Sequence, residues 1–306
     1  MRRDELGTQG ALWCCPVCRE RLALSEGGSR WVCPAGHSFD VAREGYVNLL
    51  LAGQRRSRQL GDSTEMVNAR RRFLATGAYD PLSAAVAQAV TAEQPAVVLD
   101  VGCGEGHHTR AVAAATVLGV DVAKAAVAAA ARAHPGGWYA VASATDLPLQ
   151  DGAVDVALNV FGPVAAEELA RVVRPGGAVV TAHPGEAHLE ALRSMVYPQA
   201  RPHTVKPPLR NAGEWFTQTG SMSVTFGVVV TDVAGLRDLF AMTPYRWQAP
   251  PDIDARLAAA VAPRFETVAD VRVTTYRRLF DRESPVRSGR LSAPRSTPQM
   301  RTGSRS

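Results

Sequence analysis

The sequence LDVGCGEG at residues 99–106 joins an apolar run to a loop that has glycine at three alternate positions. The unbroken apolar run 96–101 predicts a buried parallel strand, because such strands are covered on both faces of a sheet. Gly102, Gly104 and Gly106 let the backbone approach a ligand closely where that strand ends. The stretch therefore predicts an α/β domain with a doubly wound, Rossmann-like sheet and a ligand site at this loop.

The residues on either side of this loop alternate between strand and helix patterns, as a doubly wound sheet requires. We expect strands at 117–121, 154–160 and 178–182, and helices at 109–115, 123–133 and 165–173. Residues 63–92 predict one or two helices before the first strand, capped by Ser63 or Thr64. Residues 265–279 alternate as in a closing antiparallel strand pair.

Acidic residues around the glycine loop indicate which ligand it binds. Asp100 precedes the first glycine, Glu105 lies within the loop, and Asp121 ends the next strand, where a carboxylate can accept hydrogen bonds from ribose hydroxyls. A dinucleotide pyrophosphate would be repelled here, whereas the ammonium and sulfonium of S-adenosylmethionine are cations. The pattern favours a class I methyltransferase. Asp146, in the turn at 143–148, either accepts from the adenine amino group or is a solvated turn residue.

Four of the five cysteines lie in residues 14–33, which indicates metal binding in a reducing compartment. Cys15 and Cys18 form one ligand turn, and Cys33 and His37 form a second, so that together they can close a tetrahedral, structural Zn²⁺ site. Cys14 is a competing ligand with a poorer spacing. The alternative interpretation is a set of buried free thiols.

The length of 306 residues and 46% hydrophobic content indicate one main domain with an appendage, and the net charge of +5 favours a polyanionic partner. No apolar run approaches the ~20 residues of a membrane span, so we expect no membrane partner and a cytoplasmic location. The predicted units are a zinc-binding domain (1–50), a linker and helical lead-in (51–92), a methyltransferase domain (93–282) and a disordered basic tail (283–306).

Beyond these motifs, the chain resembles the zinc-containing family of 23S ribosomal RNA guanine-N1 methyltransferases, which includes macrolide-resistance members of actinobacteria. The resemblance covers about residues 14–280 and is most specific in the zinc motif and the run that follows it. The matching segments are Cys15, Cys18, Cys33 and His37; FDVAREGYVNLL at 39–50; GDS at 61–63; Met66; ARR at 69–71; GAY at 77–79; the glycine loop; EELARVVRPGG at 167–177; PG at 184–185; HL at 188–189; and MTPYRW at 242–247.

The resemblance implies transfer of a methyl group to N1 of a guanine in a 23S rRNA hairpin, by a homodimer whose zinc module helps to grip the RNA. It also implies cofactor contacts at Tyr79, Gly104, Glu105, Asp121, Asp146 and His188. Taken alone, His188 would be a surface histidine and Tyr79 a packing aromatic.

The strand ending at 159–161 is expected to meet the target base. Asn159 would orient the base, and Phe161 would stack on it or simply fill the core. Arg55, Arg56, Arg58, Arg70, Arg71 and Arg72 are candidate phosphate contacts. Two other functions stay open, namely a small-molecule methyltransferase of antibiotic biosynthesis and a non-catalytic, zinc-dependent RNA-binding protein.

Overall fold

The computed structural model describes residues 12–53, 61–197 and 206–280, and its main element is a mixed sheet of eight strands. These strands are β4 (Tyr46–Asn48), β5 (Val97–Val101), β6 (Thr116–Asp121), β7 (Trp138–Val141), β8 (Val154–Val160), β9 (Val173–Pro184), β10 (Phe216–Val230) and β11 (Phe265–Arg278). Their order is β10-β11-β9-β8-β5-β6-β7-β4, and only the pairs that involve β11 are antiparallel. The strand order reverses at β5, so the predicted doubly wound α/β class is confirmed.

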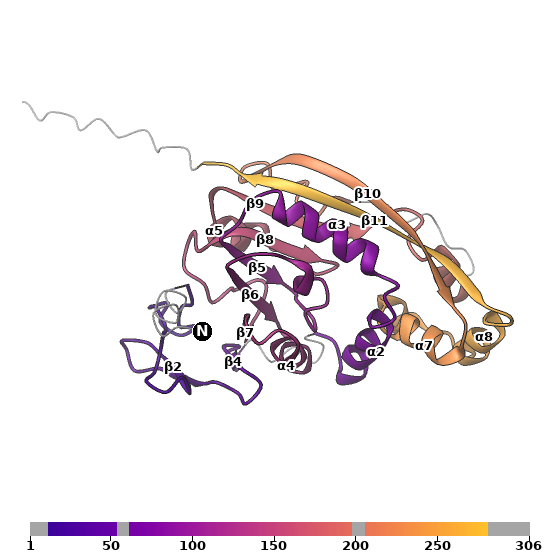
Figure 1. Ribbon diagram of the computed structural model, residues 1–306, viewed down its shortest axis with the longest axis horizontal. Coiled ribbons are helices and arrows are strands. Elements are labelled where there is room, and N and C mark those ends of the chain that lie inside the picture. The colour runs from indigo at the N-terminus through magenta and orange to yellow at the C-terminus, as the bar shows by residue number, and fades with distance from the viewer. Residues whose placement is uncertain (1–11, 54–60, 198–205, 281–306) are drawn as a thin grey trace, which may run out of the picture.

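Helices cover both faces of this sheet (Figure 1). They are α2 (Thr64–Leu74), α3 (Asp80–Thr91), α4 (Lys124–Ala133), α5 (Ala166–Val172), α6 (Glu190–Val196), α7 (Val233–Ala241) and α8 (Ile253–Ala260). Val98 of β5 packs in the core with α3, whereas Leu99 and Val101 belong to the core on the other face, with α5. This alternation explains the unbroken apolar run of β5, since each face of the strand is buried.

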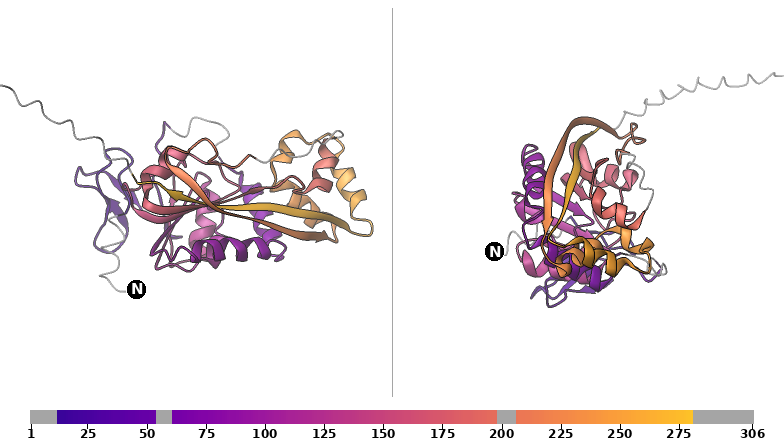
Figure 2. Two further views of the ribbon diagram at one scale, coloured as in Figure 1. Left: turned by 90° about the horizontal axis from the view of Figure 1, so that it is seen from above. Right: turned by 90° about the vertical axis from the view of Figure 1, so that its right-hand side faces the viewer.

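Residues 12–45 form a small ribbon module with an antiparallel sheet of β1 (Ala23–Leu24), β2 (Arg30–Val32) and β3 (Ser38–Asp40). The module lies at one end of the molecule, opposite α7 and α8 (Figure 2). Its Trp31 packs edge-on against Trp138 of β7, with ring centroids 5.6 Å apart. Trp13 and Trp31 belong to the same buried cluster as Leu99, so the two parts share a core.

The strand β4 leaves the ribbon module and joins the main sheet, parallel to β7. The predicted division at residue 50 stays a prediction, but the last strand before it is part of the methyltransferase sheet.

Two predictions of local structure are wrong. The helix expected at 109–115 is a single 3₁₀ turn, Thr109–Ala111, because Val112 is extended and buried and β6 already begins at Thr116. Residues 265–279 are one strand of the expected pair, and its partner β10 was not foreseen. Ser63 is the N-cap of α2, with its hydroxyl accepting from the Met66 amide at 3.3 Å. The predicted basic tail and residues 55–58 lie outside the described residues.

Candidate functional site

A cavity of about 650 Å³ opens at the carboxyl ends of β5, β6 and β8, where the strand order reverses. A volume of this size is typical of small-molecule and cofactor sites. The glycine loop, the loops after β6, β7 and β8, and the inner side of α2 line it. The cavity therefore lies at the position that the glycine motif predicted.

The glycine loop has a left-handed backbone at all three glycines. The φ angles are +79° at Gly102, +55° at Gly104 and +77° at Gly106, values that other residues adopt only with strain. The Gly102 amide donates to the Val120 carbonyl at 2.8 Å, which ties the loop to β6. A Cβ on Gly106 would lie 3.3 Å from the Ala130 Cβ, so this glycine also lets the loop pack closely on α4.

Asp100 is buried at the end of β5 and lines the cavity. Its Oδ2 accepts a hydrogen bond from the Thr109 hydroxyl, but Oδ1 has no partner among the described residues. Burial raises the pKa of Asp100 to about 7, in spite of the hydrogen bond from Thr109. A buried carboxylate with an unpaired oxygen is costly by itself and fits a cationic ligand group such as an ammonium.

Asp121 lines the cavity from the end of β6. Its Oδ2 accepts from the Gly104 amide at 3.0 Å and its Oδ1 from the Ala123 amide at 2.8 Å. Because each carboxylate oxygen has two lone pairs, both oxygens can still accept from a diol. Burial raises the pKa of Asp121 as well. Two amides and the strand end thus hold this carboxylate rigidly where a ribose would bind.

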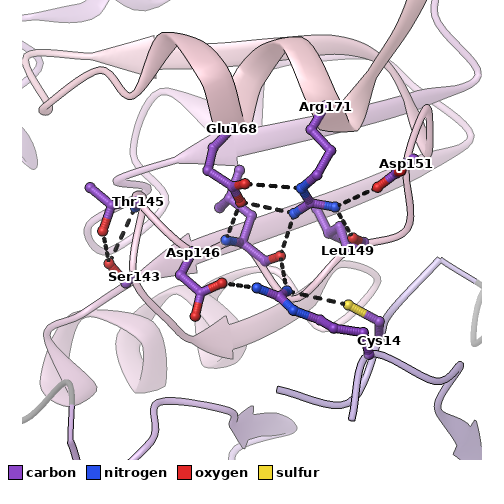
Figure 3. Close-up of polar contacts among 10 residues, drawn as sticks. Cys14, Ser143, Thr145, Asp146, Leu149, Asp151, Glu168 and Arg171 are labelled. Carbon is purple, nitrogen blue, oxygen red and sulfur yellow. Dashed lines mark hydrogen bonds and ion pairs between the residues drawn. The ribbon is translucent and has the colours of Figure 1, made fainter. Parts of the chain in front are cut away.

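The structure places seven of the nine predicted cofactor residues in the cavity lining: Tyr79, Asp100, Gly102, Gly104, Glu105, Asp121 and His188. Gly106 lies outside the lining and packs on α4. Asp146, labelled in Figure 3, lies outside it too. Its carboxylate is paired with Arg19 of the ribbon module. Burial raises the pKa of the Tyr79 hydroxyl above its usual value, so that side chain stays neutral. The individual roles stay predictions.

Phe161, in the loop after β8, also lines the cavity and has the exposure expected of a base-stacking residue. Its side chain is 43% exposed, its φ is +57°, and its ring lies 5.5 Å from the His188 ring. A left-handed backbone at a bulky residue is uncommon and is found mostly at functional sites. The His188 Nδ1–H donates to the Asp270 carbonyl at 2.9 Å, which fixes the orientation of the imidazole.

Asn159, by contrast, is buried and lies outside the lining. Its Nδ2 donates to the Val101 carbonyl at 2.7 Å and to the Pro163 carbonyl at 3.3 Å. A Cβ on Gly162 would come within 2.6 Å of that nitrogen. Asn159 therefore ties the loop that carries Phe161 to the end of β5, instead of facing a bound base.

Several lining residues had no predicted role in the cavity. Residues 242–245, at the end of α7 and the start of the 3₁₀ helix η3 (Pro244–Gln248), close one side, and His107 and His108 follow the glycine loop. Arg70 also lines the cavity, where it pairs with Asp62. The only sequence signal for 242–245 was the family motif MTPYRW, which gives no indication of its position in space.

The four predicted metal ligands come together at one point in the ribbon module. Their donor atoms lie within 4.8 Å of one another, with 3.6 Å between the sulfurs of Cys18 and Cys33 and 3.4 Å from Cys33 Sγ to His37 Nδ1. Zn–S bonds of ~2.3 Å in a tetrahedron separate ligand atoms by roughly 3.8 Å, so the group fits a zinc ion. Cys14 is not part of this cluster, and its sulfur instead accepts from Arg19.

Two of the arginines proposed to contact phosphate are engaged in ion pairs. Arg70 pairs with Asp62 as described, and Arg72 forms a two-point contact with Asp238 at 2.8 and 2.5 Å. Arg71 is exposed on α2. Arg55, Arg56 and Arg58 lie outside the described residues. Of the described candidates, Arg71 best keeps its predicted role.

Comparisons with known proteins match both parts of the chain. The zinc-ribbon family model described as RlmA, N-terminal, matches residues 13–58, and a methyltransferase-domain model matches residues 99–181. These matches, with the Cys/His cluster and the cavity, confirm the predicted cofactors, a structural zinc ion and S-adenosylmethionine. In the described ranges, no helix has the length and apolar composition needed to cross a bilayer.

Three relatives align over most of their length. A Micromonospora griseorubida protein, provisionally named a 23S rRNA (guanine-N(1)-)-methyltransferase, is 38% identical over 86% of this chain and 96% of its own. The 23S rRNA (guanine(748)-N(1))-methyltransferase of Streptomyces fradiae is 37% identical over 87% and 96%. A Bacillus subtilis strain 168 protein with the same provisional name as the first is 31% identical over 78% and 88%.

Proposed function

The chain belongs to the family of 23S ribosomal RNA (guanine-N1)-methyltransferases, and we propose that it methylates N1 of a guanine in a hairpin loop of 23S rRNA. The observation that carries this proposal is the identity of 37–38% to such proteins over nearly their whole length. The zinc cluster and the cavity support it, because both parts of the chain retain the groups that bind metal and cofactor.

The acidic residues Asp100 and Asp121 of the cavity are suited to the cofactor. When bound, S-adenosylmethionine supplies a methyl carbon made electrophilic by a positively charged sulfur. Asp100 would accept from the methionine ammonium through the oxygen that has no partner in the described part of the chain, and Asp121 would accept from the ribose hydroxyls. The Ser143–Thr145 turn lies along the cavity where the adenine would follow.

The rings of Phe161 and His188 in the cavity lining are suited to an extruded base. Enzymes that act on a nucleobase take it out of its stack and hold it against aromatic side chains. Phe161 offers an exposed ring, and His188 lies beside it. Asn159 fixes the loop that carries Phe161 to the end of β5. N1 of neutral guanine carries a proton, which must pass to an acceptor as N1 takes the methyl group. Holding N1 in line with the methyl carbon would supply much of the rate acceleration. Phe161 and His188 would do this directly, and Asn159 would act through the loop that it fixes.

The test is transfer of a radiolabelled methyl group from S-adenosylmethionine to protein-free 23S rRNA, followed by primer extension. Methylation at N1 blocks Watson–Crick pairing, so we expect one labelled stop in a hairpin loop. Asp121→Ala should abolish transfer and cofactor binding without changing the zinc content, because Asp121 lines the cavity and is not one of the four metal ligands. Cofactor binding without any labelling of RNA would point to a small-molecule acceptor.

We further propose that this methylation protects its host from macrolides, as in the macrolide-resistance members of the family. Expression of the wild-type chain in a macrolide-susceptible actinobacterium should raise the minimal inhibitory concentration, whereas Asp121→Ala should leave it unchanged. Equal values for the two proteins would instead assign the methylation to ordinary ribosome maintenance.

A homodimer that acts in the cytoplasm, where 23S rRNA is found, completes the proposal. The edge strand β10 has a row of backbone groups with no strand beside them in the described part of the chain, which is a surface that can pair with a second copy. Light scattering coupled to gel filtration should give twice the chain mass of 32.6 kDa. A monomer mass at micromolar concentration would contradict the dimer.

A further inference from the structure

The zinc ribbon touches the methyltransferase domain at the loop after β7. Arg19 follows the ligand Cys18 directly, has a φ of +63°, and donates its backbone amide to the Cys15 carbonyl at 2.8 Å. Its guanidinium pairs with the Asp146 carboxylate and donates to the Leu147 carbonyl at 3.1 Å. The arginine is thus held at its backbone by the zinc turn and reaches the opposite domain with its side chain.

The loop that Arg19 contacts forms part of the cofactor cavity. Ser143, Ala144 and Thr145 line the cavity, and Asp146 closes their turn by donating its amide to the Ser143 carbonyl at 3.2 Å. The hydroxyls of Ser143 and Thr145 lie 2.8 Å apart within the turn. The Asp146 carboxylate is therefore paired with the ribbon, while the residues just before it line the cavity.

The other side of the same loop is held by α5, as Figure 3 shows for Glu168 and Arg171. Glu168 accepts from the Leu147 amide at 2.7 Å, and Arg171 donates to the carbonyls of Leu147 and Leu149 at 2.7 and 2.6 Å. One side of the loop is thus fixed within the methyltransferase domain. The other side depends on the ribbon, through Arg19 and through the Cys14 amide, which donates to the Pro148 carbonyl at 2.9 Å.

We propose that the zinc ribbon, beyond any contact with RNA, positions the cofactor cavity. Arg19 acts as the positioning residue: it holds Asp146 so that the Ser143–Thr145 turn keeps its place against the cofactor. This proposal rests on the proposed function in one respect, that the cavity binds S-adenosylmethionine. It does not require RNA to be the acceptor.

The test is the affinity of the full-length, zinc-loaded chain for S-adenosylmethionine, measured by calorimetry without RNA. Arg19→Ala should weaken binding about three- to tenfold, since the ion pair is partly exposed and one arm of the loop's support is lost. Arg19→Lys should restore part of the affinity, because it keeps the charge beside Asp146. Arg30→Ala is the matched control, since Arg30 forms an exposed ion pair with Asp40 inside the same ribbon. It should bind like the wild type.

A double-mutant cycle separates this role from direct contact of Asp146 with the adenine. If Asp146 acts through Arg19, then Arg19→Ala/Asp146→Asn should bind no more weakly than the weaker single variant. If the fold losses of affinity in the two single variants multiply in the double variant, Asp146 contacts the ligand independently and the proposal is overturned. Unchanged affinity in zinc-replete Arg19→Ala would overturn it as well.

Zinc content is measured on each variant. If Arg19→Ala loses its metal, Asp146→Asn still decides, because it leaves the ribbon sequence intact, and wild-type affinity in that variant overturns the proposal. Because the binding measurement contains no RNA, its result is independent of whether 23S rRNA is methylated.

Discussion

Asp100 is the residue in which stability and ligand binding conflict most clearly. Burying a carboxylate with an unpaired oxygen costs free energy, and the rise of its pKa to about 7 expresses that cost. A bound ammonium would supply the missing partner and favour the ionised form. The cavity is therefore prepared for a cation before one arrives.

From this follows a pH dependence of cofactor binding. In the free protein Asp100 is largely protonated at pH 6 and ionised at pH 8, so the affinity for S-adenosylmethionine should rise about tenfold from pH 6 to pH 8. Asp100→Asn should weaken binding about ten- to a hundredfold and remove most of this slope. Calorimetry at pH 6, 7 and 8 measures both effects. A wild-type affinity that does not change with pH would contradict the assignment.

The raised pKa of Asp100 makes the free energy of unfolding fall with rising pH, whereas the affinity for the cofactor rises. A carboxyl whose pKa is raised on folding binds its proton more tightly in the native state, so its contribution to stability falls as the pH rises from about 4 to 7. The ligand-free Asp100→Asn protein should accordingly melt at a higher temperature than the wild type at pH 8.

The sequence predicted correctly those residues that short turns and strand ends bring together. The zinc ligands lie on two short turns and form one cluster, and the acids beside the glycine loop lie at strand ends and line one cavity. The ion pair of Asp146 could not be predicted in this way, because Arg19 comes from a segment more than a hundred residues earlier. No local pattern contains such a contact, and the position of Asn159 behind the cavity was hidden for the same reason.

Among the elements, the joint between the glycine loop and α4 leaves little room for a side chain at Gly106. Gly106→Ala should lower the free energy of unfolding by about 1–2 kcal/mol, because φ is +77° and the new Cβ would press on Ala130 at 3.3 Å. Urea denaturation measures the change. Gly136→Ala is the control, since its Cβ would have ordinary contacts at 3.7 Å and longer. Equal midpoints for the two variants would show that the joint adapts freely.

The elements that the sequence predicted correctly, such as β5, β8 and α4, carry several buried apolar residues each, which the sequence shows as apolar runs. The missed strand β10 is exposed along most of its length. Its sequence did carry a signal, because Met222, Val224, Phe226 and Val228 alternate with Ser221, Ser223, Thr225 and Gly227. The false helix at 109–115 has helix-forming alanines, but tertiary packing overrides their propensity because Val112 is buried in an extended conformation.

At the scale of the whole molecule, the ribbon and the sheet form one core through Trp13, Trp31 and their neighbours. Loss of zinc should therefore affect both parts. Cys33→Ser should lose the metal and at least about 3 kcal/mol of the free energy of unfolding, a fraction of the roughly 10 kcal/mol that a structural zinc site provides.

The control is Cys14→Ser, because Cys14 is a buried neighbour of the ligands but lies outside the cluster. It should keep one zinc per chain, measured by atomic emission, and unfold close to the wild type. Metal-free protein that remains fully folded, or loss of zinc from Cys14→Ser, would refute the assignment of the four ligands.

The parallel pairing of β4 with β7 also affects the order of folding during translation. A ribosome completes the zinc turns once His37 has been added, but the docking partners of the ribbon, β7 and the bridge from Trp13 to Leu149, come much later. At ~5–20 residues per second the nascent ribbon waits roughly 5 to 20 s before it can dock. Metal capture during translation would then precede assembly of the sheet edge and protect an otherwise bare N-terminal segment in that interval.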